Sequence, residues 1–258
     1  MHSLSGAYEE ALLKHVRPSG ILERETDSLS VLDVGFGLGY NVLALIASLL
    51  EVGYKGKLSV VSLERDRKLL PFLEQIVFSD QRDEIYSVIR SAYSKGCLRS
   101  NSLSLDILFG DARSFVRSLP DGAYDAIFFD PFSPARNPEL WSFHFFREMF
   151  RLMNESAILT TYSSAPQVRG ALTAVGFIIG RGPAVGGKRE GTLASKTDLI
   201  APLSKIDMAA LTDNIRSVPY RDEHLSEDPG LILERRKREI RALREQRSKM
   251  HHSGTVTD

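Results

Sequence analysis

Residues 31–41 read Val31-Leu32-Asp33-Val34-Gly35-Phe36-Gly37-Leu38-Gly39-Tyr40-Asn41, and they set the interpretation of the whole chain. A short β-type run ends in a glycine at every second position, and apolar residues at helical spacing follow. A strand, a glycine turn and a helix in this order are typical of a nucleotide-binding crossover, because glycine permits close approaches that a Cβ would block. The turn alone is equally consistent with a tight connection that binds nothing.

The spacing of the glycines distinguishes between cofactors. A dinucleotide fingerprint reads G-x-G-x-x-G and has an acidic residue about 20 positions further on. Here the spacing is G-x-G-x-G, and an acidic residue, Asp33, already lies on the strand. This form favours a cofactor without a pyrophosphate, such as S-adenosylmethionine, over NAD.

Composition sets the broad class. The chain has 258 residues, 43% of them hydrophobic and 26% charged, with 33 basic and 33 acidic side chains. This length suits one large core or one domain with an appendage. One cysteine, Cys97, excludes an internal disulfide and a cysteine-based metal cluster, so no metal is expected. There is no signal-peptide pattern and no apolar run near the ~20 residues that span a bilayer, so a cytoplasmic protein that does not bind membranes is expected.

Strand and helix patterns alternate along residues 1–200. Helix patterns fall at 6–17, 42–51, 69–77, 85–93, 112–118, 138–153 and 165–174, and strand patterns at 31–34, 58–64, 103–109, 124–129, 157–162, 176–179 and 191–195. Alternation of this kind predicts a mostly parallel sheet with helices on both faces. The expected fold is therefore α/β and Rossmann-like, with seven strands, as in class I S-adenosylmethionine-dependent methyltransferases.

Residues 201–258 are expected to form an extension rather than part of the sheet. Residues 197–230 lack a clear period, whereas residues 231–250 read as one helix with eight basic and three acidic side chains. A charge run of this kind is either a solvated helix face or a surface for RNA. Residues 251–258 are predicted to be disordered.

Three carboxylates and the glycine turn end successive predicted strands, at Gly35, Glu64, Asp111 and Asp130. Ligands of open parallel sheets bind beyond the carboxyl ends of the strands. Glu64 could accept hydrogen bonds from both ribose hydroxyls, and Asp111 from the adenine amino group. Asp111 could equally cap the helix at 112–118.

The glycine turn itself has two further polar candidates. The backbone of residues 35–39 leaves room for the methionyl part of the cofactor. Asp33 either ties the turn or binds the amino group, and Asn41 either caps the following helix or contacts the ligand. The sequence leaves both choices open.

The segment Asp130-Pro131-Phe132-Ser133-Pro134 has the acid, proline and aromatic residue of loops at which amines are methylated. A primary alkylamine is protonated at neutral pH because its pKa is near ~10. Asp130 could bind that ammonium, orient it and take its proton. Phe132 and Trp141 could stack on a planar base, although Trp141 also suits a helix core. The alternative for Asp130 is a strand-end acid that ties the loop.

Residues 130–141 closely resemble the D-x-F-[AS]-P-x-[KR]-N-P-x-[LM]-W segment of the MnmC-type tRNA wobble-uridine methyltransferases. The resemblance covers about residues 2–195. Its further matches are His2-Ser3, Gly6-Ala7, Glu10, the glycine turn with Asn41, Gly110-Asp111-Ala112, Thr161-Tyr162-Ser163-Ser164-Ala165, Gly170, Gly176-Phe177 and Gly187-Lys188-Arg189-Glu190.

The resemblance implies N-methylation of 5-aminomethyl(-2-thio)uridine to the 5-methylaminomethyl form in the tRNA anticodon loop, with S-adenosylmethionine as cofactor. Asp130 is then the catalytic residue. Carried over by position, Glu10, Gly35, Gly37, Glu64, Asp111 and Asp130 would line the cofactor and reaction site. Together with the glycine turn and its neighbours, the expected cofactor-binding set is Glu10, Asp33, Gly35, Phe36, Gly37, Gly39, Asn41, Glu64, Asp111, Ala112 and Asp130. The set for the tRNA substrate is Phe132, Arg136, Lys188 and Arg189.

Two features limit what the resemblance implies. Asp130 is followed by Pro131, where fused members of the family usually have Asp-Gly. Many members also carry a flavin oxidase domain, which is not expected within this chain. For the oligomeric state, a monomer is favoured. Two other functions stay open: N-methyl or aminopropyl transfer to a polyamine-like small molecule, and a non-catalytic cofactor-binding module for RNA or a partner.

Overall fold

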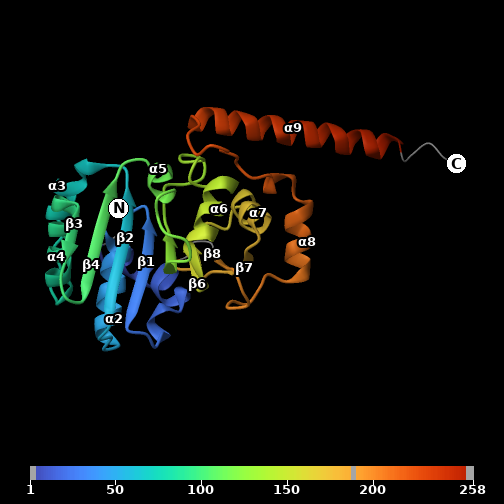
Figure 1. The fold of residues 1–258 in the computed structure, drawn as a ribbon. Helices are drawn as coiled ribbons and strands as arrows, with labels where there is room; N and C mark the ends of the chain where they lie inside the picture. Colours follow the sequence, from blue (N-terminus) through green and yellow to red (C-terminus); the bar gives the residue numbers. More distant parts are fainter. Residues whose placement is uncertain (1–3, 187–189, 254–258) are drawn as a thin grey trace.

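The protein is built on one twisted sheet that helices cover on both faces (Figure 1). The computed structural model describes residues 4–186 and 190–253. In these residues the sheet has eight strands in the order β3-β4-β2-β1-β5-β6-β8-β7. The strands are β1 (Ser28–Val34), β2 (Lys57–Glu64), β3 (Cys97–Arg99), β4 (Leu103–Phe109), β5 (Tyr124–Phe129), β6 (Met153–Thr161), β7 (Ile178–Arg181) and β8 (Thr192–Ser195).

The expected Rossmann-like class is confirmed, but the strand count is not. Strands β4, β2, β1, β5 and β6 are parallel, and β8 and β7 are antiparallel at one edge. The eighth strand is β3, which pairs antiparallel with β4 at the other edge. It has only three residues, too few to display a period, and it follows directly on a helix that ends at Lys95 with Gly96 as its C-cap.

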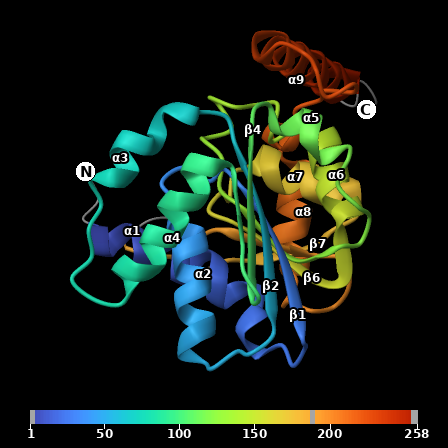
Figure 2. The same cartoon turned by 60° about the vertical axis from the view of Figure 1, so that its left-hand side comes forward.

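One face of the sheet is covered by the first four α-helices, and the other by the next three (Figure 2). The first group is α1 (Leu4–Ala11), α2 (Tyr40–Glu51), α3 (Leu70–Glu74) and α4 (Arg82–Lys95), and the second is α5 (Ala112–Val116), α6 (Phe143–Leu152) and α7 (Pro166–Val175). Each face has its own cluster of buried apolar side chains. The two clusters explain why the parallel strands read as apolar runs rather than as alternating patterns.

Short helical turns connect these elements. A π-helix, η1 (Leu12–Val16), continues α1, and 3-10 turns η2 (Arg17–Ser19) and η3 (Ile21–Glu23) lead into β1. Turn η4 (Arg67–Leu69) precedes α3, and η5 (Ile215–Ser217) lies in the extension. The helix predicted for 138–153 begins at Phe143, because the Ser142 hydroxyl caps it by accepting from the backbone N–H of Phe145.

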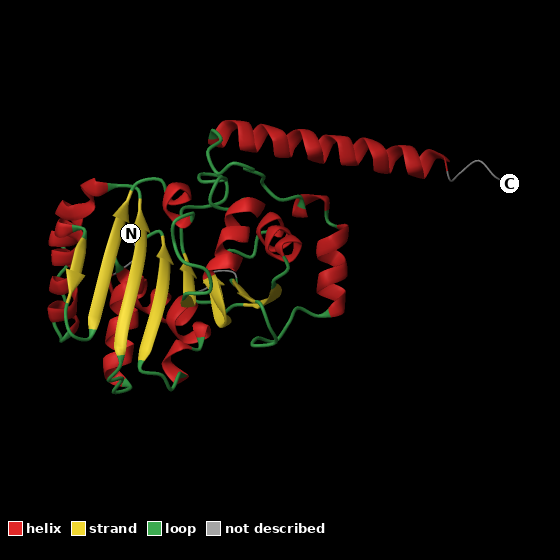
Figure 3. Ribbon diagram, in the orientation of Figure 1, coloured by secondary structure: helices red, strands yellow, loops and turns green. Residues whose placement is uncertain are grey.

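The extension packs on the body before it leaves it. Tyr220, Leu225 and Ile232 are buried in the same apolar cluster as α6 and α7. Residues 197–230 contain a helix that the sequence did not reveal, α8 (Lys205–Asp213), which the Ser204 side chain caps. Helix α9 (Pro229–Ser253) then projects beyond the body as a long rod (Figure 3).

The predicted disorder from residue 251 onward is wrong for residues 251–253, which continue α9. No proline or glycine interrupts the helix between Gly230 and Gly254, so the first strong helix breaker comes after Ser253. Residues 254–258 lie outside the described part of the chain.

Candidate active site

The strand order reverses between β1 and β5, and there the two chain segments after these strands meet. The backbone N–H of Asp130, after β5, donates to the carbonyl of Val34 at the end of β1 (2.9 Å). A Cβ on Gly35 would lie 2.6 Å from the carbonyl oxygen of Asp130, and Gly35 has a φ of +93°. Only glycine fits this crossing, which is why the turn begins with one.

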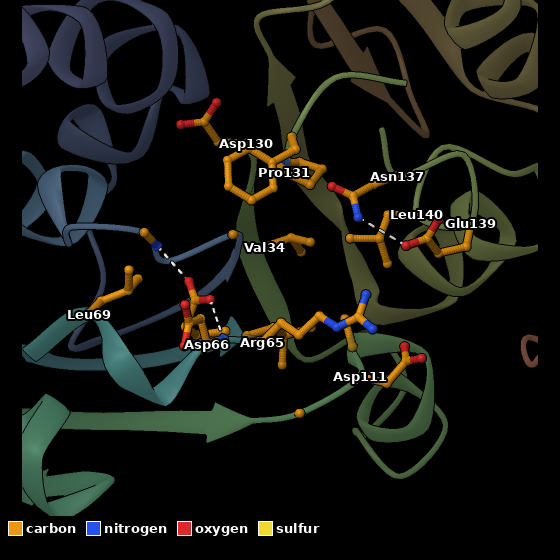
Figure 4. A pocket seen from close by; sticks show the side chains of 17 residues that line it. Val34, Arg65, Asp66, Leu69, Asp111, Asp130, Pro131, Asn137, Glu139 and Leu140 are labelled. Carbon is orange, nitrogen blue, oxygen red and sulfur yellow. Dashed lines mark hydrogen bonds between the residues drawn. The ribbon is translucent and has the colours of Figure 1, made fainter. Parts of the chain in front are cut away.

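The strand ends enclose a cavity of about 200 Å³, here called the strand-end cavity (Figure 4). Six of the expected cofactor-binding residues line it, namely Gly35, Gly37, Glu64, Asp111, Ala112 and Asp130. Apolar side chains of Leu63, Leu69 and Leu140 complete its wall, together with Arg65, which the sequence did not single out.

Glu64 organises the glycine turn. One of its carboxylate oxygens, Oε2, accepts from the backbone N–H of Gly37 (2.8 Å), and the other, Oε1, accepts from that of Asp66 (2.7 Å). A carboxylate has about four acceptor positions, so these two bonds fix its orientation and leave capacity for further donors. The arrangement suits a ligand with two neighbouring hydroxyl groups.

Asp111 sits at the start of α5 as its N-cap, accepting from the backbone N–H of Arg113 (3.0 Å). The Arg113 guanidinium also pairs with the carboxylate of Asp111, at 2.7 Å between Nη2 and Oδ2. Burial acts to raise the pKa of Asp111, but the bonds and charge of Arg113 outweigh it and lower that pKa. Asp111 is therefore a charged acceptor at the cavity wall.

Three of the expected cofactor-binding residues line neither this cavity nor the one described next. Asp33 is fully buried and accepts from Asn41 (3.2 Å) and Ser62 (3.0 Å), so it ties the turn. Phe36 is buried and stacks on Tyr93, and Gly39 is the αL residue before α2. The side chains of Asp33 and Phe36 thus point into the core and Gly39 has none, so contact of these three residues with a cofactor stays a prediction.

A second cavity of about 550 Å³, here called the N-terminal cavity, lies between the sheet edge and the first helices. Its wall includes Glu10 of α1 and Asn41 of α2, both expected at the cofactor. Asp130, Pro131 and Phe132 line both cavities. The two cavities therefore meet at the acid-proline-aromatic loop.

Asp130 is accessible at this junction, because 39% of its side chain is exposed. Desolvation by the surrounding protein, followed by the negative charge of Asp33, raises the pKa of Asp130 to about 7. The side-chain amide of Asn41 reaches both Asp33 and Asp130 (3.2 and 3.5 Å) rather than capping its own helix. A carboxyl poised near neutral pH suits acid–base chemistry.

His15 faces Asp130 from η1, and the sequence did not mark it as functional. Its Nε2 lies 3.9 Å from Asp130 Oδ1, and its Nδ1 lies 2.9 Å from Thr160 Oγ1. The Thr160 hydroxyl also lies 3.5 Å from the carbonyl oxygen of Ile127; in the tautomer in which Nδ1–H donates to Thr160, that hydroxyl donates to Ile127 and Nε2 keeps its lone pair. Burial, then the charge of Lys14, lowers the pKa of His15 to about 4.

Lys14 is the second buried polar residue that the sequence did not reveal. It is 4% exposed and pairs with Glu10 one helical turn earlier (2.8 Å). Residues 14–16 are buried in succession within η1, a π-helical turn of the kind often found at functional sites. The only sequence signal was polar residues on a short amphipathic helix, which is too common to be diagnostic.

The loop after Asp130 is held by its carbonyl groups. Trp141 Nε1–H donates to the carbonyl of Phe132 (2.8 Å), and the Tyr162 hydroxyl donates to that of Pro131 (3.0 Å). Trp141 is fully buried, so its role as a stacking surface is excluded. Phe132 is 71% exposed at the mouth of both cavities, with the Arg136 guanidinium 5.5 Å from its ring centre.

Lys188 and Arg189, expected at the substrate, lie outside the described residues. Among the described residues, no helix is long and apolar enough to cross a membrane. Those residues also contain no group of three histidine, cysteine or acidic side chains arranged to hold a metal ion.

The strand-end cavity fits a nucleoside cofactor by its own features. Its floor is a glycine turn that a Cβ at Gly35 would obstruct, and its wall carries five acidic residues, Glu64 and Asp111 among them, beside leucine side chains. Glu139, also at the wall, has a buried oxygen, Oε2, that accepts no hydrogen bond from the described residues. Apolar walls with a few oriented acceptors are the composition that ligand sites share.

Comparisons with known proteins show the family of this chain. Residues 79–197 match the family described as S-adenosyl-L-methionine-dependent methyltransferase. The crystal structure of MnmC2 from Aquifex aeolicus superposes with a TM-score of 0.83 at 34% identity, covering 93% of this chain and 78% of that one. An uncharacterised protein of Methanocaldococcus jannaschii is 32% identical over 95% of this chain and 68% of its own length.

A further relative is the bifunctional protein MnmC of Pseudomonas fluorescens, named for tRNA 5-methylaminomethyl-2-thiouridine biosynthesis. It is 34% identical over 61% of this chain, and the match spans only 25% of its own length. The Aquifex match covers most of both chains, and the family match names the cofactor. The chain therefore belongs to the MnmC-type family of S-adenosyl-L-methionine-dependent methyltransferases.

Proposed function

We propose that this enzyme transfers a methyl group to the amine of 5-aminomethyl(-2-thio)uridine at the wobble position of tRNA. The observation that carries the proposal is the sharing of Asp130 by two cavities. One cavity suits a nucleoside cofactor, and the other has acidic groups for a cation. The name of the relative MnmC, which refers to tRNA 5-methylaminomethyl-2-thiouridine biosynthesis, supports the same substrate class.

The residues of the strand-end cavity would hold the cofactor. Glu64 would accept from the ribose hydroxyls, Asp111 from the adenine amino group, and the Gly35–Gly37 backbone would leave space for the methionyl part. When bound, S-adenosylmethionine supplies an electrophilic methyl group. Everything else in the reaction is positioning and proton transfer by the chain itself.

Asp130 would act on the substrate amine. The substrate ammonium enters the N-terminal cavity and donates to the Asp130 carboxylate, which accepts one of its protons and leaves a nitrogen lone pair free. A second N–H of the amine can donate to His15 Nε2, which keeps its lone pair at neutral pH. After this transfer the amine would turn so that its two remaining N–H groups donate to the unprotonated oxygen of Asp130 and to His15 Nε2, and its lone pair would then face the strand-end cavity.

The base and the tRNA would be held at the rim. Phe132 is an exposed aromatic ring on which a splayed-out uridine can stack, worth about 1–3 kcal/mol per base. Arg136, Lys188, Arg189 and the basic face of α9 would contact phosphates, which provide affinity without reading sequence. We further propose that the enzyme acts as a monomer.

The test is methyl transfer to undermodified tRNA. Purified protein, labelled cofactor and tRNA that carries 5-aminomethyl-2-thiouridine are incubated, and the nucleosides are analysed by mass spectrometry. The proposal expects 5-methylaminomethyl-2-thiouridine as the product and no label in free polyamines under the same conditions. Label in polyamines and not in tRNA would establish the small-molecule alternative instead, and label in neither would favour a binding module.

A further inference from the structure

A buried ionic cluster joins the C-terminal extension to the strand-end cavity. Arg113 is 8% exposed and has one acidic partner on each side: Asp111 at the cavity wall and Asp222 in the extension. Its Nη1 donates to Asp222 Oδ2 and to the carbonyl of Glu227, both at 2.8 Å. The guanidinium thus bridges the two parts of the chain.

Asp222 is also fixed by hydrogen bonds to its neighbours. It is fully buried, and its Oδ1 accepts from the backbone N–H groups of Ser226 and Glu227 (3.0 and 3.1 Å). The chain reverses here through Leu225, the non-glycine residue with a φ of +52°. This turn, residues 222–227, holds one oxygen of the Asp222 carboxylate, and the other oxygen, Oδ2, accepts from Arg113. We call it the Asp222 turn.

Helix α9 is hydrogen-bonded to the same turn. Arg235, in its second helical turn, pairs with Glu227 (2.7 Å) and donates to the carbonyl of Arg221 (3.2 Å). Ile232, one turn earlier on the same helix, is fully buried. A continuous series of hydrogen bonds therefore runs from α9 through the Asp222 turn and Arg113 to Asp111.

We propose that the Asp222 turn is a functional part of the cofactor site: through Arg113 it fixes the Asp111 carboxylate in the orientation that recognises the adenine ring. An isolated Asp111 would rotate about its side-chain torsions. With Arg113 donating to both of its oxygens (Nε at 3.1 and 3.2 Å), the carboxylate plane is set. Arg113 and Asp222 are positioning residues, and the inference rests on the adenine-recognition role proposed for Asp111.

The experiment measures adenine recognition directly, without methyl transfer. Binding of S-adenosylhomocysteine and S-inosylhomocysteine to the full chain is compared by calorimetry. The inosyl analogue has a carbonyl oxygen in place of the amino group, so the donor that Asp111 is proposed to accept from is replaced by an acceptor. Since a hydrogen bond to a charged group contributes about 1.5–3 kcal/mol, the unaltered protein should prefer the adenosyl ligand about 10- to 100-fold.

In Asp222→Asn the preference should fall by about 5-fold or more, because each kcal/mol of lost discrimination is about 5-fold. General destabilisation would weaken both ligands equally and leave the ratio unchanged. If Asp222→Asn does not fold, the same ligand preference is measured on the double variant Arg113→Met/Asp222→Leu. Replacing a buried ion pair by apolar residues of similar size is often neutral for stability, yet this variant should also lose the preference.

Asp207→Asn is the matched control. Asp207 is a carboxylate of the extension that pairs with Arg181 at the surface, away from the cavity (2.9 Å). This variant should keep the full preference. A preference retained by folded Asp222→Asn or by the double variant would overturn the proposal, as would equal binding of the two ligands by the unaltered protein. None of these outcomes depends on tRNA, so the proposed reaction is tested separately.

Discussion

The strand-end cavity and the N-terminal cavity share Asp130, Pro131 and Phe132 but are built in different ways. The strand-end cavity is lined largely by residues at or just after the ends of β1, β2, β4 and β5, and backbone N–H groups orient its Glu64. The N-terminal cavity is closed by a helix from the start of the chain, which brings charged side chains over the sheet edge. Local motifs thus form one cavity, and a long-range contact forms the other.

This difference suggests that one cavity binds the cofactor and the other carries out proton transfer. The strand-end cavity offers fixed acceptors, as a site for one constant cofactor requires. The N-terminal cavity contains Glu10, Lys14, His15 and Asp130, of which Asp130 has a pKa raised to about 7 and His15 one lowered to about 4. Substitutions in the first should therefore change cofactor affinity, and substitutions in the second the rate of transfer.

The largest expected effect is at the residue that both cavities share. Asp130→Asn removes the proton acceptor, so methyl transfer should fall by about 10²- to 10⁴-fold. Affinity for S-adenosylhomocysteine, measured by calorimetry, should change less than about 3-fold because the amide is isosteric. Transfer at more than a tenth of the original rate would remove Asp130 from the mechanism.

Glu64→Gln tests whether the strand-end cavity contributes to cofactor affinity rather than to the rate of transfer. An amide can accept on one oxygen only, so the variant loses charged hydrogen bonds that contribute about 1.5–3 kcal/mol. The KM for the cofactor should rise about 10- to 100-fold, with kcat at saturating cofactor less affected. A matched change at Glu10, Glu10→Gln, should leave the Kd for S-adenosylhomocysteine within about 3-fold.

The pH profile tests the N-terminal cavity. The Asp130 carboxylate accepts a proton only when ionised, and its ionised fraction rises with pH through about 7. Values of kcat/KM should thus increase about tenfold per pH unit below that value and level off above it. The inflection should be absent in Asp130→Asn, and an unchanged profile there would assign it to another group.

His15→Asn should lower kcat by about 10-fold through the loss of one oriented acceptor, worth about 1.5 kcal/mol. Since His15 is neutral in the whole range, the inflection near pH 7 should keep its position. Thr160→Val, which removes the hydroxyl that accepts from His15 Nδ1, should produce a smaller fall in the same direction. A shift of the inflection in His15→Asn would show that His15 itself titrates.

The smallest effect is expected outside both cavities, on α9. Arg238, Arg241 and Arg244 are exposed there. Changing all three to Gln should weaken tRNA binding and reduce its salt dependence by about one unit of slope for each phosphate that is no longer neutralised. The three Lys variants at the same positions keep the charge and should bind nearly normally. Equal salt dependence in both sets would return α9 to the alternative of a solvated helix face.

The sequence predicted most of what local patterns can specify. Apolar runs and the glycine turn identified the parallel strands, because a strand buried on both faces must be apolar along its length. Glu64, Asp111 and Asp130 were found because each follows such a strand, and residues at that edge converge by topology. The strand β3 and helix α8 were missed, since three residues carry no period and α8 has no buried residues to mark one face.

Only the tertiary structure decided which side chains meet. His15 faces Asp130 across 115 positions of sequence, and Arg113 meets Asp222 across 109. It also decided that Asp33, Phe36 and Gly39 hold the turn rather than line a cavity. Backbone conformation follows from near neighbours, so sequence alone determined the fold class and the cofactor edge. Burial and pKa depend on residues distant in sequence, so the proton acceptor's environment and the role of the extension emerged only in the folded chain.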